Sequence, residues 1–250
     1  MWLLQLQLLF NLRYNMQEEL DRLERISEDS WYGKGANYYT IQYSLQIFER
    51  YMIPGTVLEL GPAEGISTDI LQNHWPDISV VEGSGIFCER LKSKYPKITV
   101  HHCLFEDFCP NIKYDNVVMG HVLEHVQDPV EILKKGKTWV SDRGKIFAAV
   151  PNCRSLHRQA GVLLKLIMEE NELNPTDIHH GHRRVYCPES FRSDFLKAGL
   201  SIQVFGGYWL KPLSNDQIEK TWTKEMLYAF MVLGERYPDI AAENYIVATK

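Results

Sequence analysis

Short apolar segments alternate regularly with amphipathic stretches through the middle of the chain, and this alternation constrains the fold more than any other feature. The apolar segments lie at residues 56–60, 78–82, 98–102, 116–119 and 145–150. They are continuous rather than alternating with polar residues, which is typical of parallel strands covered by helices on both faces. The pattern therefore predicts repeated strand–helix–strand units in a three-layer α/β/α fold.

The rest of the chain predicts further helices and strands. The expected helices lie at residues 16–26, 38–51, 156–171, 188–198 and 216–233, and the expected additional strands at 201–205 and 243–249. A chain of 250 residues can bury one sizeable core. We therefore expect an N-terminal helical extension at residues 1–30 and one domain at 31–250, with an insert at 151–186 before the sixth strand.

The charge and the cysteine content disfavour several classes of protein. The net charge of −5 provides no basic field that would attract nucleic acid, so we expect no nucleic-acid partner. The five cysteines are odd in number and include no C-x-x-C pair, which suggests neither a disulfide framework nor a zinc knuckle. A cytoplasmic location fits this composition.

The first residues, MWLLQLQLLF at 1–10, are apolar but too short to span a bilayer, and they lack a cleavage site. We expect a helix that packs on the domain or on a second subunit, so that the N-terminal helix could form a homodimer. Weak membrane contact is the alternative, but no membrane partner is expected.

The segment VLELGPAEGIST, residues 57–68, leads from the first strand directly into a helix. Gly61 and Gly65 allow the backbone to turn sharply and to approach a ligand, and the helix directs free N–H groups to the same place. A dinucleotide site requires G-x-G-x-x-G, but Ala63 and Ile66 replace two of these glycines. The turn predicts a ligand site and disfavours an NAD-dependent oxidoreductase.

This turn resembles motif I of the class I S-adenosylmethionine (SAM)-dependent methyltransferases, E/D-x-G-x-x-x-G, and the resemblance covers residues 38–250. It implies a Rossmann-like, seven-stranded and mostly parallel sheet with an antiparallel last strand. It also implies that SAM is the cofactor, with an acidic side chain near the cofactor's ammonium group. The contacts expected at the turn are Glu59, Gly61, Pro62, Ala63 and Gly65.

The next two strands add further expected cofactor contacts. Glu82 ends the second strand, where the fold places a carboxylate that accepts hydrogen bonds from the ribose hydroxyls. Gly83 and Ser84 then open the next helix. After the third strand, Leu104 stands where the family often has an acidic residue. Adenine is therefore expected to contact the backbone of residues 104–106, the side chains of Leu104 and Phe105, or Glu106.

The segment YDNVVMGHVLEHVQDP, residues 114–129, resembles the family's fourth motif and places Gly120 and His121 beside the methionine part of SAM. His121, Glu124 and His125 would share one face of a helical turn. Three interpretations stay open. Glu124 and His125 could brace the turn, or a histidine, His121 or His125, could act as general base.

In the third interpretation the trio binds a divalent ion, because ubiquinone-pathway O-methyltransferases carry a similar Glu-x-x-Glu-His run with a metal role. A histidine in place of the first glutamate disfavours magnesium, which prefers oxygen ligands. We therefore expect no metal.

The insert contains DIHHGHRRVY at residues 177–186, a concentration of histidine and arginine in an acidic chain. Long insertions at the ligand edge of a sheet commonly contact substrate. We expect the acceptor to contact His179, His182, Arg183 and Arg184, because arginine binds anionic groups in bidentate fashion. His179, His180 and His182 are alternative bases.

The segments at 181–186 and 210–215 resemble those of bacterial methyltransferases that modify sugars or other secondary metabolites. We therefore predict methyl transfer from SAM to a hydroxyl oxygen of a small, polar or anionic metabolite such as a sugar derivative. N-methylation of a small molecule is the alternative. A non-catalytic cofactor-binding or scaffold protein with the same fold is a third hypothesis.

Overall fold

A computed structural model describes residues 17–30 and 32–250. The N-terminal segment at 1–10, predicted to pack on the domain or a second subunit, lies outside the described residues. Residues 17–28 are helical. The named helices are α2 (Gly35–Glu49), α3 (Ile66–His74), α4 (Gly85–Lys94), α5 (Pro129–Trp139), α6 (Leu156–Leu163), α7 (Pro175–His179), α8 (Pro188–Lys197), α9 (Asn215–Thr221) and α10 (Lys224–Gly234), with a 3₁₀ turn η1 (Phe105–Asp107).

Seven strands form one sheet in the order β3-β2-β1-β4-β5-β7-β6. Their bounds are β1 (Val57–Leu60), β2 (Ile78–Glu82), β3 (Thr99–His102), β4 (Tyr114–Gly120), β5 (Val140–Pro151), β6 (Ser201–Tyr208) and β7 (Glu243–Thr249). Strands β1 to β5 are mutually parallel, and β7 pairs antiparallel with both β5 and β6. The predicted Rossmann-like sheet with an antiparallel last strand is confirmed.

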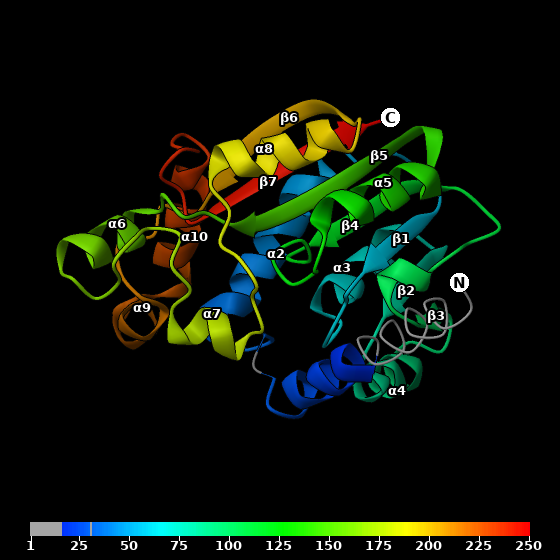
Figure 1. Ribbon diagram of the computed structural model, residues 1–250, viewed down its shortest axis with the longest axis horizontal. Coiled ribbons are helices and arrows are strands. Elements are labelled where there is room, and N and C mark those ends of the chain that lie inside the picture. Colours follow the sequence, from blue (N-terminus) through cyan, green and yellow to red (C-terminus); the bar gives the residue numbers. More distant parts are fainter. Residues whose placement is uncertain (1–16, 31) are drawn as a thin grey trace, which may run out of the picture.

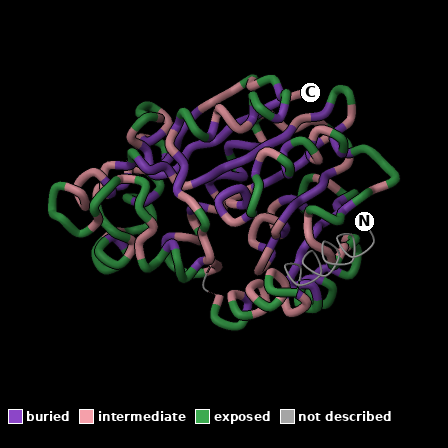
Figure 2. Tube along the Cα trace, in the orientation of Figure 1, coloured by how far each residue is buried: buried purple, intermediate pink, exposed green. Residues whose placement is uncertain are grey.

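Helices cover both faces of the sheet and create two hydrophobic cores (Figure 1). On one face, α5 and α8 pack side chains such as Leu133 and Phe191 against the sheet. On the other face, α2, α3, α4 and α10 pack side chains that include Phe48 and Leu71. The strands β1, β2, β4 and β7 between these layers are almost entirely buried (Figure 2), which explains their continuous apolar sequences.

Two predicted helices are shorter than expected. The helix predicted at residues 216–233 is divided into α9 and α10, because Trp222 and Thr223 adopt extended conformations and the Thr223 side chain caps the new helix at the Met226 N–H, 3.3 Å away. The helix predicted at 156–171 ends at Leu163. The short helix α7 in the same insert was not predicted.

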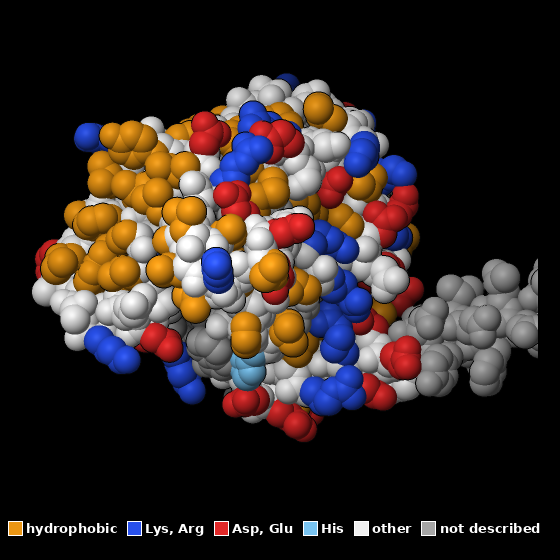
Figure 3. Space-filling view, turned by 60° about the vertical axis from the view of Figure 1, so that its left-hand side comes forward, with side chains coloured by type: hydrophobic (Ala, Val, Ile, Leu, Met, Phe, Trp, Pro, Cys, Tyr) orange, Lys and Arg blue, Asp and Glu red, His pale blue; other side chains and the backbone are white. Residues whose placement is uncertain are grey.

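The insert carries exposed apolar side chains in a region where the space-filling view shows hydrophobic groups gathered on one side of the molecule (Figure 3). Leu163, Leu164, Leu166 and Met168 are each at least 70% exposed. Among the helices of the described residues, none is long and apolar enough to cross a membrane.

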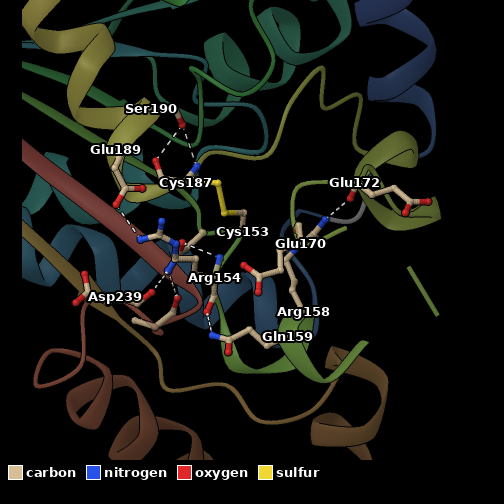
Figure 4. The surroundings of a disulfide bond; sticks show 12 residues. Cys153, Arg154, Arg158, Gln159, Glu170, Glu172, Cys187, Glu189, Ser190 and Asp239 are labelled. Carbon is tan, nitrogen blue, oxygen red and sulfur yellow. Dashed lines mark hydrogen bonds and ion pairs between the residues drawn. A yellow bond between two sulfur atoms is a disulfide. The ribbon is translucent and has the colours of Figure 1, made fainter. Parts of the chain in front are cut away.

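A disulfide joins Cys153, just after β5, to Cys187, just before α8 (Figure 4). The expectation that the cysteines form no disulfide is therefore wrong for this pair. Spacing gave no signal because 34 residues separate the two cysteines, and the fold brings their Cα atoms to 5.1 Å. The cysteine content therefore no longer supports a cytoplasmic location, which stays a prediction.

Replacing Cys153 with serine is expected to lower the free energy of unfolding by about 3 to 4 kcal/mol, because the bond closes a long loop in the unfolded chain. Urea unfolding with and without reductant measures the change. The matched control is Cys109→Ser, at an exposed free cysteine. A wild-type unfolding midpoint that does not respond to reductant would show that the bond contributes no stability.

Candidate functional site

A cavity lies at the carboxyl ends of β1, β2, β3 and β4, the edge at which open α/β sheets bind ligands. The predicted cofactor contacts that line it are Gly61, Pro62, Ala63, Glu82, Gly83, Ser84, Leu104, Phe105, Glu106, Gly120 and His121. Two predicted contacts, Glu59 and Gly65, are not among the lining residues. Segments from four strand ends thus meet around one hollow, because parallel strands all finish at the same edge.

The glycine turn shapes one wall of this cavity. Gly61 has a φ of +61°, and a Cβ there would lie 3.3 Å from the side chain of Val122, another lining residue. Gly65 also has a positive φ, +77°, but a Cβ on it would lie 2.8 Å from the ring of Tyr95, behind the wall. The Tyr95 hydroxyl donates to the Gly65 carbonyl at 2.7 Å. Gly61 therefore borders the cavity, whereas Gly65 lets α3 and α4 pack closely.

Glu59 stabilises the glycine turn from the interior of the protein. Its carboxylate is buried and accepts hydrogen bonds from the hydroxyls of Ser67 and Thr68, the latter at 2.6 Å. Burial raises the pKa of Glu59 to about 7, although these two hydrogen bonds lower it. The contacts tie β1 to the first turn of α3, and they give Glu59 a positioning role in the structure.

Glu82 lies in the wall and organises two neighbouring turns. One carboxylate oxygen accepts from the Ala63 N–H at 3.2 Å, and the other accepts from the Ser84 N–H at 2.9 Å. Burial raises the pKa of Glu82, although the backbone hydrogen bonds lower it. The side chain therefore holds the glycine turn against the start of α4, and it presents carboxylate oxygens at the end of β2.

The helix at residues 17–28 covers this cavity, which the sequence analysis did not foresee. Arg22, Leu23 and Ile26 contribute to the lining. Glu24 accepts hydrogen bonds from the Gly85 N–H at 2.6 Å and from the Ser84 hydroxyl at 3.0 Å, so the helix is fastened to the N-terminus of α4. The helix at residues 17–28 packs on its own domain, and the homodimer through the N-terminal segment stays a prediction.

His121 follows Gly120 at the end of β4 and has a positive φ of +56°, which is strained for a histidine. The Nε2 atom lies 3.1 Å from the hydroxyl of Tyr208, and Nδ1 lies 3.3 Å from Oε1 of Glu124 and 3.9 Å from Oε2 of Glu243. Burial lowers the pKa of His121, but the contact with Glu124 and the charge of Glu243 outweigh it and raise the pKa.

Sequence reasoning missed Tyr208 and Glu243, the buried partners of His121. These two residues face each other across the antiparallel pair of β6 and β7. No local motif marks them, because they meet His121 only through the order of strands in the sheet. The signals available in the sequence were a tyrosine at the end of one strand, Tyr208 in β6, and a glutamate at the start of the next, Glu243 in β7.

The predicted helical turn at residues 121–125 is wrong, because these residues form a non-helical turn before α5. His125 and His180 both line the cavity, and the Tyr32 ring stacks on His180 with centroids 4.6 Å apart. Burial and the charge of His182 lower the pKa of His125 to about 3 and that of His180 to about 4. Both rings are therefore neutral near pH 7 and are weak bases.

The remaining predicted acceptor residues lie outside the lining. Arg184 donates to the backbone carbonyls of Leu123, Val126 and Gln127 at 2.6–2.9 Å. Arg183 donates to the His125 carbonyl at 2.8 Å and pairs with Glu19 at 2.5 Å.

These guanidinium groups brace the turn that carries His121, and the expected role of Arg183 and Arg184 in binding an anionic acceptor stays a prediction. His179 and His182 also lie outside the lining. Nδ1 of His182 is 3.2 Å from an Asp177 carboxylate oxygen.

Among the described residues, one group of potential metal ligands is found, consisting of Glu124, His125 and His182. His121 is not a member of this group. The trio considered from the sequence is thus replaced by a set that includes one histidine of the insert.

Comparisons with known proteins agree with this architecture. A family model described as a methyltransferase domain matches residues 12–203. No curated protein matches the sequence significantly.

Three solved structures are similar in fold. A SAM-dependent methyltransferase of Thermotoga maritima, titled a possible histamine N-methyltransferase, has a TM-score of 0.58 at 16% identity, covering 93% of this chain and 95% of that one. A SAM-dependent methyltransferase of Mesorhizobium loti has a TM-score of 0.59 at 14% identity, with coverages of 83% and 96%. The glycopeptide N-methyltransferase MtfA has a TM-score of 0.56 at 12% identity, with coverages of 84% and 89%.

These identities establish similarity of fold and no more. The family model, however, covers most of the chain, and it includes the glycine turn, the Glu82 strand end and the His121 turn. The chain therefore belongs to the family of methyltransferase domains, as its sequence motifs predicted.

Proposed function

We propose that this methyltransferase transfers the methyl group of SAM to a hydroxyl oxygen of a small polar acceptor, with His121 as the general base. The observation that carries the proposal is the position of His121. A strained backbone holds its ring at the cavity wall, between the end of β4 and the buried pair Tyr208 and Glu243.

The lining residues fit the parts of SAM. The apolar side chains of Leu104 and Phe105 suit adenine, and the carboxylate of Glu82 suits the ribose hydroxyls. Gly61 leaves room for the chain that joins ribose to sulfur. Gly120 and His121 then lie next to the methionine part. Glu59 contributes by holding the turn rather than by direct contact.

When bound, SAM supplies an activated methyl group: a bond forms between the acceptor oxygen and the methyl carbon while the carbon–sulfur bond breaks, leaving neutral S-adenosylhomocysteine. His121 receives the hydroxyl proton. Glu124 faces Nδ1 and so favours the tautomer that carries its hydrogen there, which leaves Nε2 as the proton acceptor. The acceptor hydroxyl must displace the hydroxyl of Tyr208 from Nε2, because this nitrogen has a single lone pair. Alignment and proton removal account for most of the required catalysis.

The acceptor side of the cavity is assigned to Tyr32, Ile41 and His180, which line it. A flat stack of a phenol ring on an imidazole suits a ring-shaped, hydroxylated metabolite such as a sugar derivative. Because Arg183 and Arg184 are engaged with backbone carbonyls, an anionic group on the acceptor is not required.

A small-molecule amine is the second candidate acceptor. Glu124 and Glu243 are buried carboxylates close to His121, and negative charge there favours an ammonium group. Structures of similar fold include one titled a glycopeptide N-methyltransferase. His121 would then remove the ammonium proton before methyl transfer.

Calorimetry with SAM, followed by mass spectrometry of matched acceptor panels, tests the proposal. We expect SAM binding, and a methylated product from hydroxylated acceptors but not from the corresponding amines. Methylation of the amines alone would favour the second candidate. Binding without any turnover would favour a scaffold protein, and absence of SAM binding at millimolar concentration would contradict the enzyme hypothesis altogether.

Replacing Glu24 with alanine is expected to weaken SAM binding about five- to tenfold, because the helix at 17–28 would lose its attachment to Ser84 and Gly85 and cover the cavity less often. Burial raises the pKa of Glu24, but these hydrogen bonds outweigh it and lower the pKa, so the charged form makes the attachment at neutral pH.

The matched control for this change is Glu28→Ala, at an exposed position of the same helix. Calorimetry gives the dissociation constants, and thermal melting confirms that both variants are folded. Equal affinities for the two variants would show that the attachment does not govern cofactor retention.

A further inference from the structure

Glu124, His125 and His182, here called the metal triad, offer one ligand atom each within 4.8 Å of one another. Glu124 and His125 come from the turn after β4, whereas His182 comes from the insert, so only the folded chain brings them together. The His125 and His182 rings meet edge to face with centroids 4.7 Å apart. His125 also lines the cavity, which places the triad beside it.

Glu124 lacks the partners that a buried carboxylate needs. The residue is fully buried, and neither carboxylate oxygen makes a hydrogen bond of good geometry. Oε1 has the Nδ1 atom of His121 as a neighbour at 3.3 Å, whereas Oε2 has no hydrogen-bond partner. Burying an anion in this way is costly unless a cation compensates it. The second oxygen is therefore the natural place for a bound cation.

His182 is oriented in the manner of a metal ligand. Its Nδ1 atom faces Asp177 at 3.2 Å, which leaves Nε2 as the nitrogen available to an ion. Asp177 is itself fixed by Arg158 at 3.1 Å and by the N–H of Asn174 at 2.9 Å. A carboxylate behind a histidine sets the ring tautomer and raises the basicity of the other nitrogen, an arrangement typical of metal sites.

Backbone contacts hold the triad rigidly. The Glu124 carbonyl accepts from the Arg183 N–H at 2.8 Å, and the His125 carbonyl accepts from the side chains of Arg22 at 3.1 Å and Arg183 at 2.8 Å. The His182 N–H donates to the Asp177 carbonyl at 2.8 Å. A metal–ligand bond of about 2.1 Å places tetrahedral ligands about 3.4 Å apart, so only small side-chain rotations are needed to complete the site.

We propose that the metal triad binds one divalent transition-metal ion of the zinc class, with the fourth coordination position open. Two imidazoles and one carboxylate suit Zn²⁺, Co²⁺ or Fe²⁺ and are a poor set for Mg²⁺, which prefers oxygen ligands. The inference does not rest on the methyl acceptor proposed above, because it concerns metal binding alone.

Zinc titration of the chelator-treated full chain tests the site by calorimetry. We expect one Zn²⁺ per chain, not displaced by excess Mg²⁺. His182→Ala and His125→Ala should each weaken zinc binding by about a hundredfold or more, whereas the matched control His74→Ala, at an exposed histidine of α3, should bind like the wild type. No zinc binding by the wild-type chain, or equal affinities in all variants, would overturn the proposal.

Cobalt substitution provides a readout that does not depend on the variants. Co²⁺ at a low-symmetry, four-coordinate site absorbs visible light strongly, whereas six-coordinate Co²⁺ absorbs weakly. We expect a strong spectrum in the wild-type chain that zinc abolishes, together with a rise in the melting temperature. A weak, six-coordinate spectrum would overturn the proposal even if the alanine variants failed to fold.

Discussion

Replacing His121 with asparagine is expected to lower kcat by about 10²- to 10⁴-fold, the range for loss of a general base. Asparagine is the informative substitution because it tolerates the positive φ of +56° that His121 adopts, so the turn after β4 keeps its shape. It cannot, however, take up a proton near neutral pH. The SAM dissociation constant should stay within a few-fold of the wild-type value, since Glu82 and the glycine turn are unchanged.

Single-turnover kinetics with saturating SAM measures this effect without interference from product release. The matched control is His74→Asn, at an exposed histidine outside the cavity. A kcat unchanged by His121→Asn would exclude His121 as the base and return the role to another group in the wall.

The role of His121 as general base also predicts the pH dependence of the reaction. His121 must be neutral to accept a proton, and its pKa is raised in the folded protein, so kcat/KM should rise with pH through a value above the ordinary histidine pKa of about 6.5. Glu243→Gln removes a negative charge that favours the imidazolium form. This variant should therefore shift the rising limb to lower pH.

Local sequence was sufficient to predict the strands and most of the cavity wall. Each segment with predicted cofactor contacts lies at the end of a strand, as Gly61 follows β1 and Glu82 ends β2. A motif of a few residues therefore indicates both the strand and the position of the contacts in the fold. The parallel sheet then brings these segments to one edge. This meeting at one edge follows from the topology of a parallel sheet, which the sequence pattern already predicted.

Features that depend on long-range contacts were not predictable in the same way. Tyr208 and Glu243 meet His121 because β7 inserts between β5 and β6, and nothing in their neighbouring residues signals the contact. The Cys153–Cys187 bond likewise depends on where the insert returns to the sheet.

The arginines show a different limit of sequence reasoning. A basic cluster in an acidic chain suggests an anionic ligand, yet Arg183 and Arg184 satisfy backbone carbonyls of the turn at residues 121–127. Composition cannot distinguish these roles, because the same guanidinium donors serve a carbonyl or a carboxylate. The helix at 17–28 lines a cavity of its own domain, a contact that its own sequence did not indicate.

Replacing Glu82 with alanine is expected to weaken SAM binding about 10²- to 10³-fold. Two hydrogen bonds from ribose hydroxyls to a carboxylate, at about 1.5 to 2 kcal/mol each, account for this range. The change also leaves the N–H groups of Ala63 and Ser84 without their acceptor, so the glycine turn would lose its attachment to the start of α4. Because the ribose is common to both compounds, S-adenosylhomocysteine should lose affinity by the same factor.

Glu82→Gln separates these two contributions. The amide keeps one oxygen acceptor and the side-chain shape, so the variant should remain folded and lose an intermediate amount of affinity. Glu89→Ala, at an exposed position of α4, is the matched control. Calorimetry with both compounds gives the dissociation constants, and melting curves show whether the turn is intact. If Glu82→Ala bound SAM as tightly as the control, the ribose would have to lie elsewhere in the cavity, and the orientation of SAM proposed here would be wrong.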